Sequence, residues 1–576
     1  MSDSLPRTAD EFLALDVPTM AAFYTDLARH PLTAANVSDW LAEWTRVAEL
    51  AEESFWRLYV AMTTHTDDAE ALRRYEWFTG EVQPALQAAE HPLKKKLLDS
   101  GLEPPGFAVP LRNMRAEAAL FREENLPLLA QEKQLATQWT QITGAHTVEW
   151  GGEEVTLYAL RPIYQGADRA DREAMWNLAT DRWRADRDAI TDIWRRLLAV
   201  RVQIARNAGL PDYRAYRWQQ LFRFDYTPED CARYADAIEQ VAVPVATRLY
   251  EQRKAQMGGR RPWELGIDFL YPWSPLTDPL GRPPLRPFEA TETLIEKVGA
   301  IFQRLDPVLF EYFDLMRREG LLDLESRPHK GPGAYCTGFA AARRAFIFMN
   351  AVGFHDDVST LIHESGHAFH DFETFHLPYL QQRGMDAIPI EFAEVASMGM
   401  EYLAAPYLPA SEGGFYSVED TARARIEHLE YGMQFWPYMA VVDGWQHWAY
   451  THPDEAADPA RCDEVWEGLW RRFLPGADWS DLDHIRSGWQ QKVHLFEVPF
   501  YYVEYGLAQM GAVQVWRNAL TDPAGALAQY RRALSLGATV PLPDLFAAAG
   551  AKFAFDAGTL REVVGLMSET RDRLAG

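Results

Sequence analysis

The stretch that decides the fold and chemistry of this chain is residues 356–370, which read Asp-Asp-Val-Ser-Thr-Leu-Ile-His-Glu-Ser-Gly-His-Ala-Phe-His. It contains the pattern His-Glu-x-x-His, formed by His363, Glu364 and His367. On an α-helix, residues four apart lie one turn apart on the same face, so both imidazoles can reach one metal ion. Glu364 lies about 100° round the helix from His363, within reach of a metal-bound water. The pattern predicts a zinc-binding helix with an acidic pair at its amino-terminal end. The competing interpretation, an exposed helix carrying two histidines, is disfavoured because a chance match anywhere in the chain has a probability of about 3%.

A catalytic zinc site needs a third protein ligand and keeps its fourth position for water. Downstream, Pro389 suits the first turn of another helix, on which Glu391, Glu394 and Glu401 share one face. The spacing does not choose among these acids; we expect one to bind the metal and another to orient a ligating histidine. His370 is a competing ligand, which we expect to lie beside the site rather than in it.

Most of the remaining sequence predicts helices, because apolar residues recur three and four apart among abundant Ala, Leu, Glu and Arg. Residues 227–230, Thr-Pro-Glu-Asp, predict the start of a helix. Residues 148–158 predict a hairpin that turns at two glycines. Residues 346–350, Phe-Ile-Phe-Met-Asn, predict a strand, which is either buried or an edge strand able to bind an extended peptide. Residues 272–287 hold six prolines and predict a long ordered loop. These signals indicate a mainly α fold with a small β-sheet.

A boundary near residue 200 is expected, between an N-terminal helical region with the small hairpin (1–200) and a larger region with the metal motif (201–576). The chain has 576 residues, 48% of them hydrophobic and 24% charged, as is usual for globular proteins. Its 57 basic and 83 acidic residues give a net charge of −26, which argues against nucleic acid as a partner.

The cysteines Cys231, Cys336 and Cys462 are too few for a disulfide framework and lack the paired spacing of a thiolate zinc site. No secretory signal is visible, and no stretch approaches the ~20 apolar residues of a membrane span. We therefore expect a cytoplasmic protein that does not associate with membranes.

The sequence from His363 to His370, His-Glu-Ser-Gly-His-Ala-Phe-His, is followed from Glu391 by Glu-Phe-Ala-Glu-Val-Ala-Ser. Together they resemble the thimet oligopeptidase and oligoendopeptidase F family of zinc metallopeptidases. Three further segments are similar to family segments: residues 333–336, 346–350 and 494–505. Ala-Glu-Val-Ala-Ser is closest to the bacterial oligoendopeptidase F or Pz-peptidase branch.

This resemblance implies a helical zincin-like metallopeptidase with a deep substrate channel and a small β-sheet near the zinc helix. It implies that His363, His367 and Glu394 bind one zinc ion per chain, with Glu401 orienting a ligand. Glu364 would then be the general base that activates the zinc-bound water.

Residues 494–505 also have a physical interpretation, because phenol hydroxyls and an imidazole near a metal can donate hydrogen bonds to a developing oxyanion. Geometry permits Tyr505 to pair with either Tyr501 or Tyr502. The family places its two functional tyrosines three apart, which favours Tyr502 and Tyr505, with His494 upstream.

The expected function is a zinc-dependent endopeptidase, an oligopeptidase that hydrolyses short unstructured peptides. The alternatives are a helical zinc carboxypeptidase and a non-catalytic peptide-binding protein with a structural zinc. The partners expected are short peptides, and the chain is compatible with a monomer or a homodimer.

Overall fold

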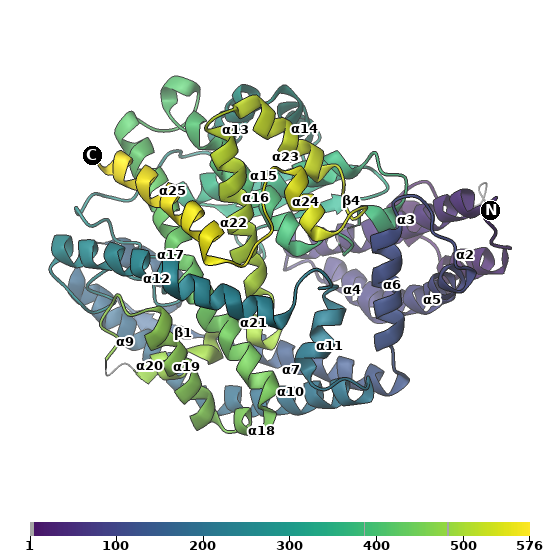
Figure 1. Ribbon diagram of the computed structural model, residues 1–576, viewed down its shortest axis with the longest axis horizontal. Helices are drawn as coiled ribbons and strands as arrows, with labels where there is room; N and C mark the ends of the chain where they lie inside the picture. The colour runs from purple at the N-terminus through teal and green to yellow at the C-terminus, as the bar shows by residue number, and fades with distance from the viewer. Residues whose placement is uncertain (1–4, 167, 385, 481–482) are drawn as a thin grey trace. The chain divides into compact units, whose positions relative to one another are not determined.

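The computed structural model describes residues 5–166, 168–384, 386–480 and 483–576, and most of them lie in helices (Figure 1). The chain forms two compact units, each built from three segments: Met1–Ala118, Arg286–Thr421 and Gly511–Phe553 in unit 1, and Ala119–Leu285, Ala422–Met510 and Ala554–Gly576 in unit 2. The sequence predicted two continuous regions that meet near residue 200. In the structure, position 200 lies inside a helix. Within the described ranges, no helix is both long and apolar enough to cross a membrane.

Unit 1 contains a three-stranded sheet surrounded by helices. Its α-helices are α1 (Ala9–Leu13), α2 (Val17–Arg29), α3 (Val37–Thr64), α4 (Ala69–Trp77), α5 (Gln83–Ser100), α6 (Ala108–Leu120), α13 (Thr291–Leu305), α14 (Pro307–Arg318), α15 (His355–Thr374), α16 (Ile390–Ala404), α23 (Pro523–Leu534) and α24 (Leu542–Ala548). Its strands are β3 (Leu322–Glu325), β4 (Tyr335–Phe339) and β5 (Arg344–Ala351). A π-helical turn, η1 (Phe78–Val82), links α4 to α5, and short 3-10 turns follow α15 and α16.

The strand over residues 346–350 is the buried one of the two alternatives. Strand β5 lies in the middle of the sheet, whose order is β3-β5-β4, and its side chains from Ala345 to Met349 are all buried. The edge-strand alternative for these residues is therefore wrong, because β3 pairs with β5 on one side and β4 on the other. The sequence does not reveal this, since β3 comes from an earlier part of the chain.

The helix that carries the His-Glu-x-x-His pattern begins directly after β5. Gly353 turns the chain with a φ of 94°, and α15 then starts at His355. The Asp357 carboxylate accepts hydrogen bonds from the backbone N–H groups of Val352, Gly353 and Phe354, at 2.9, 2.8 and 2.9 Å. The bond from Phe354, the residue that caps α15, satisfies a donor that a helix start otherwise leaves unpaired, and the other two hold the turn before it, so the expected acidic pair fixes the position of the helix through Asp357.

Unit 2 is almost entirely helical. Its α-helices are α7 (Leu126–Gly144), α8 (Arg161–Gln165), α9 (Arg169–Ala185), α10 (Arg187–Asn207), α11 (Tyr213–Gln220), α12 (Pro228–Met257), α18 (Pro453–Ala456), α19 (Pro459–Phe473), α20 (Asp483–Arg486), α21 (Val493–Phe496) and α25 (Ala557–Ala575), with most of α17 (Val418–Thr451) and the first half of α22 (Tyr502–Ala519). The hairpin is present as β1 (Thr147–Trp150) and β2 (Glu153–Thr156), joined by two glycines with positive φ. The core includes a group of packed aromatic rings: Trp194, Trp445, Tyr450, Trp489 and Phe496. Together, the two units confirm the predicted mainly helical fold with small sheets.

Candidate metal centre

Helix α15 places the two histidines of the motif side by side. The ring centroids of His363 and His367 are 5.1 Å apart, and the ring planes lie at 81° to each other. This follows from the four-residue spacing, which brings both side chains to one face of the helix. Both rings keep partial exposure, with 27% and 25% of the side-chain surface accessible, so the face is open to a ligand.

Helix α16 supplies a carboxylate to the same point. The Oε2 atom of Glu394 lies 3.5 Å from Nε2 of His363 and 3.8 Å from Nε2 of His367. In a tetrahedral zinc site with bonds of about 2.0–2.2 Å, neighbouring ligand atoms are about 3.3–3.5 Å apart. The two distances to Glu394 are therefore within a few tenths of an ångström of those in a zinc site, and all three ligand atoms lie within 4.8 Å of one another. Of the three acids on α16, Glu394 is the one in this cluster.

The close approach of α15 and α16 depends on Gly366, which lies inside the motif. A Cβ atom at this position would lie 2.6 Å from the carbonyl oxygen of Ala396 and 2.6 Å from Cα of Ser397, both backbone atoms of α16. Any other residue would force the helices apart, and Glu394 would then be carried away from the histidines. This role of Gly366 was not predicted from the sequence, although a glycine inside a helix is itself a signal of close packing.

Two further side chains orient His363 and Glu394 through hydrogen bonds. Nδ1 of His363 lies 2.7 Å from Oε1 of Glu401, which fixes the proton on Nδ1 and leaves the lone pair of Nε2 for a metal. The Ser397 hydroxyl donates to Oε2 of Glu394 at 2.9 Å. Glu401 thus lies where the sequence predicts an acid that orients a histidine, and Ser397 is a further donor that the sequence did not predict.

The burial of the centre sets the charge states of its groups. Burial raises the pKa of Glu364 to about 7, and the negative charges of Glu394 and Glu401 act in the same direction. Burial lowers the pKa of His367 to about 4. Burial would also lower the pKa of His363, but its hydrogen bonds with Glu394 and Glu401 outweigh this and raise the pKa well above 6.5. Glu364, which exchanges a proton near neutral pH, therefore lies beside the three side chains that could bind a metal.

The competing ligand His370 lies outside the cluster. It is buried against the ring of Phe392 at 6.0 Å, and its Nε2 has no hydrogen-bond partner among the described residues. Burial and the charge of His367 lower its pKa to about 3, so it is neutral. It packs α15 against α16 and is not among the atoms that converge on a metal.

Strand β4 borders the centre and forms one edge of the sheet. The backbone N–H of Cys336 donates a hydrogen bond to Glu364, and β4 pairs only with β5 among the described strands. Its other edge therefore keeps backbone groups free of strand pairing.

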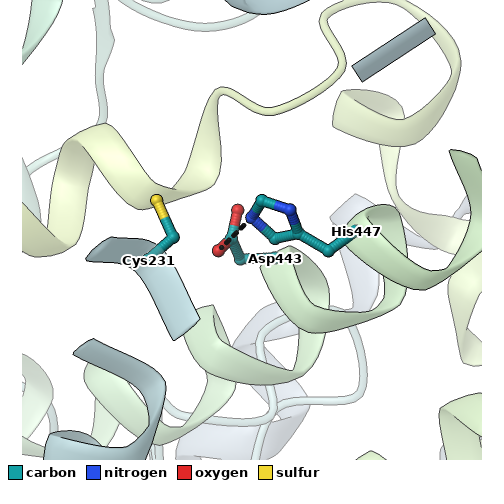
Figure 2. Close-up of side chains that lie close together, drawn as sticks. All are labelled: Cys231, Asp443 and His447. Atoms are coloured by element: carbon teal, nitrogen blue, oxygen red, sulfur yellow. Dashed lines mark ion pairs between the residues drawn. The ribbon is translucent and has the colours of Figure 1, made fainter. Parts of the chain in front are cut away.

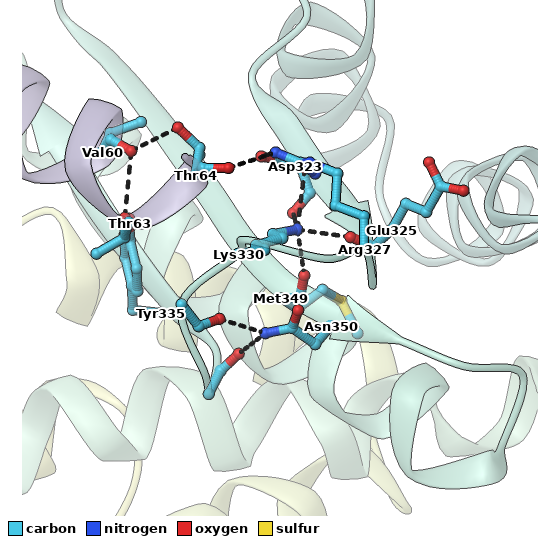
Figure 3. Close-up of polar contacts among 12 residues, drawn as sticks. Val60, Thr63, Thr64, Asp323, Glu325, Arg327, Lys330, Tyr335, Met349 and Asn350 are labelled. Carbon is cyan, nitrogen blue, oxygen red and sulfur yellow. Dashed lines mark hydrogen bonds and ion pairs between the residues drawn. The ribbon is translucent and has the colours of Figure 1, made fainter. Parts of the chain in front are cut away.

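The loop before β4 is fixed by Lys330, whose side chain is fully buried (Figure 3). Its Nζ donates to the Asp323 carboxylate at 2.9 Å and to the carbonyl oxygens of Glu325 and Met349 at 2.9 and 2.6 Å. The Asn350 side-chain amide donates to the carbonyls of Gly331 and Gly333. Gly331 also packs against the backbone of Thr63. These contacts hold Gly331 and Gly333 in a fixed turn.

The predicted tyrosines and histidine form a cluster of their own in unit 2. The ring of His494, on α21, lies 4.5 Å from that of Tyr502 and 6.4 Å from that of Tyr505, both on α22. Tyr502 is buried against Phe435, and burial raises the pKa of its hydroxyl. Tyr501 and Tyr505 lie 5.1 Å apart, and both keep partial exposure. Of the two pairs left open, Tyr501, which directly precedes α22, and Tyr505 are therefore the more accessible one.

Comparisons with known proteins identify a family and solved structures with the same fold. The model of peptidase family M3 matches residues 164–564. A solved structure of a Pz peptidase A with an inhibitor superposes with a TM-score of 0.86 at 24% identity, covering 97% of this chain and 98% of that one. A structure assigned as oligoendopeptidase F has a TM-score of 0.85 at 25% identity and covers 97% of both chains. An oligoendopeptidase F from Enterococcus faecium has a TM-score of 0.63 at 14% identity, covering 98% of this chain and 99% of that one. A search of curated proteins found no match.

Proposed function

Because this chain belongs to peptidase family M3, and is therefore a metallopeptidase that hydrolyses peptides, we propose that it is a zinc-dependent endopeptidase acting on short unstructured oligopeptides. The family match agrees with the resemblance drawn from the sequence. The observation that carries the proposal is the convergence of His363, His367 and Glu394, with the buried Glu364 beside them.

The three side chains that would hold the ion suit zinc. Two imidazoles, which bind a metal in their neutral form, and one carboxylate are a ligand set typical of catalytic zinc, which keeps a fourth position for water. When bound, zinc lowers the pKa of that water toward ~7 and polarises the substrate carbonyl. The same ligands accept other divalent ions, so zinc is proposed on chemical suitability.

Glu364 is the proposed general base. It takes a proton from the attacking water and returns it to the leaving amine, which lets one carboxylate serve both halves of the reaction. Its backbone partner on β4, Cys336, holds the carboxylate in place. An extended peptide that pairs with the free edge of β4 would lie alongside Glu364, which supports an unstructured substrate.

The resemblance supplies the proposed oxyanion donors, Tyr505 with Tyr502 and His494. Removing one such donor costs about 10²–10³-fold in rate. The accessible position of Tyr501 makes it the rival of Tyr502, so kcat for Y501F and Y502F decides between them. The proposal requires that Y505F lose activity while it retains its metal.

The test of the function compares E364Q with the control E373Q. Glu373 is on the same helix, but it pairs with Arg531 at 2.7 Å, away from the metal cluster. We expect E364Q to keep its zinc and to lose about 10²–10⁴-fold in kcat, and E373Q to stay near the parent rate. The substrate is a fluorogenic peptide blocked at both ends, and chelation should abolish its cleavage. Turnover by E364Q at the parent rate would refute the mechanism, and failure to cleave the blocked peptide internally would favour the carboxypeptidase alternative.

A further inference from the structure

A second group of metal-binding side chains lies in unit 2. Cys231 on α12 and Asp443 and His447 on α17 direct their side chains toward one another (Figure 2). Each offers one ligand atom, and the three atoms all lie within 4.8 Å of one another. Nε2 of His447 is 3.3 Å from Oδ2 of Asp443, the separation expected for neighbouring ligands of one tetrahedral ion.

The local structure places these residues for binding. Asp443 and His447 are four apart on one helix, so they share a face. Cys231 lies in the first turn of α12, just after the capping box of Thr227 and Asp230. The positive end of a helix dipole favours an anionic group there, and a metal binds cysteine as the thiolate.

The second observation is a buried carboxylate oxygen without a partner. Oδ1 of Asp443 is inaccessible and makes no hydrogen bond within the described residues, and Nε2 of His447, also inaccessible, has Oδ2 of Asp443 as its ion-pair neighbour. The Asp443 side chain is 6% exposed. An unpaired carboxylate oxygen is costly to bury, and a cation bound between these atoms would remove that cost.

The surroundings favour a closed site. The rings of Trp218 and Phe500 lie 5.7 and 5.2 Å from that of His447. Arg223, the cation that stacks on Trp218, is ion-paired with Glu504, which offsets its charge. Cys231 is 2% exposed, too buried to act as a nucleophile on a substrate. An apolar shell with few accessible atoms is typical of structural metal sites.

We propose that Cys231, Asp443 and His447 bind a second zinc ion, which joins α12 to α17 and stabilises unit 2. A set of one sulfur, one nitrogen and one oxygen ligand suits zinc and excludes magnesium and calcium, which prefer oxygen ligands alone. A water or the second oxygen of Asp443 completes the coordination. This site is independent of the metal centre on α15 and takes no part in peptide hydrolysis.

The test titrates the metal-free full-length chain with Co²⁺, because a cobalt–thiolate bond gives a charge-transfer absorption in the near ultraviolet. We expect about two equivalents bound per chain, one of them with this absorption. The double variant H363A/H367A should keep about one equivalent and the full absorption. C231S should lose the absorption and one equivalent while it keeps peptidase activity, and C336S should change neither.

The absence of the thiolate absorption from the parent chain would overturn the proposal, as would its survival in C231S. If C231S does not fold, D443N provides the second variant and should lose the same equivalent. H363A/H367A removes only the centre on α15. If that centre does not bind metal, this variant would bind as much Co²⁺ as the parent chain, whereas failure of the second site would show as a missing thiolate absorption.

Discussion

The contact between Glu401 and His363 allows a quantitative test of the metal centre. The carboxylate lies 2.7 Å from Nδ1, and its side chain is 16% exposed, so water replaces it poorly. A hydrogen bond to a charged group contributes about 1.5–3 kcal/mol. Since 1.4 kcal/mol is about tenfold in a binding constant, E401A should weaken zinc binding by about 10–100-fold, as expected for a group that orients a metal ligand.

The variant E401Q separates the charge from the hydrogen bond. Glutamine keeps an acceptor for Nδ1–H, and neutral hydrogen bonds are roughly half as strong as charge-assisted ones, so the loss should be about 3–10-fold. The dissociation constant is measured by competition with a chromophoric chelator, and kcat/KM is measured at saturating zinc. At saturation much of the activity should return, because Glu401 does not touch the substrate.

The matched control is E373Q, whose side chain is 11% exposed and pairs with Arg531 on α23 rather than with a metal-binding histidine. E373Q removes a similarly buried carboxylate charge from the same unit, so it shows how much a general loss of fold stability weakens zinc binding. Zinc affinity for E401A within about threefold of the parent would refute the orienting role. An equal weakening in E373Q would show that the effect is not specific to His363.

Three further predictions concern the surrounding structure. G366A should destabilise the fold by about 1–3 kcal/mol and weaken zinc binding, whereas G468A, a helical glycine with open space around it, should gain up to about 1 kcal/mol; equal urea midpoints would contradict the packing argument. K330M should cost about 3 kcal/mol, because it breaks a buried ion pair with Asp323, and should speed cleavage of the following loop by an added protease; unchanged unfolding and cleavage would contradict this. His370 is buried with a pKa of about 3, below its ordinary 6.5, so its stabilising contribution is present above about pH 6.5 and is lost as the pH falls toward 3. H370L should therefore reduce the acid sensitivity of the unfolding free energy by up to about 1.4 kcal/mol per pH unit below 6.5, and parallel pH profiles for parent and variant would contradict it.

Local signals predicted the elements well. The hairpin at two glycines, the capped start of α12 and the helix with His363 and His367 are all present, because each depends on neighbours within a few residues. The acidic pair before the motif likewise acts through Asp357, which lies in the first turn of that helix and accepts hydrogen bonds from the backbone leading into it.

Long-range pairing was less predictable. Spacing alone left three acids open as the third ligand, and only the resemblance selected Glu394. The strand at 346–350 read equally well as buried or as an edge, since its partner β3 lies earlier in the chain. The three segments of each unit also interleave, so no composition change marks a boundary.

The amino-acid order alone determined the helical class and the two imidazoles on one face, because helical periodicity acts over four residues. Tertiary packing decided which carboxylate meets them, since Gly366 lets the backbones of α15 and α16 touch. Packing also brought Cys231 to Asp443 and His447. Sequence spacing does not predict this contact, because Cys231 and the other two residues lie on helices far apart in the chain. Convergence of distant side chains depends on how helices fit together, and that fit is a property of whole surfaces rather than of any local pattern.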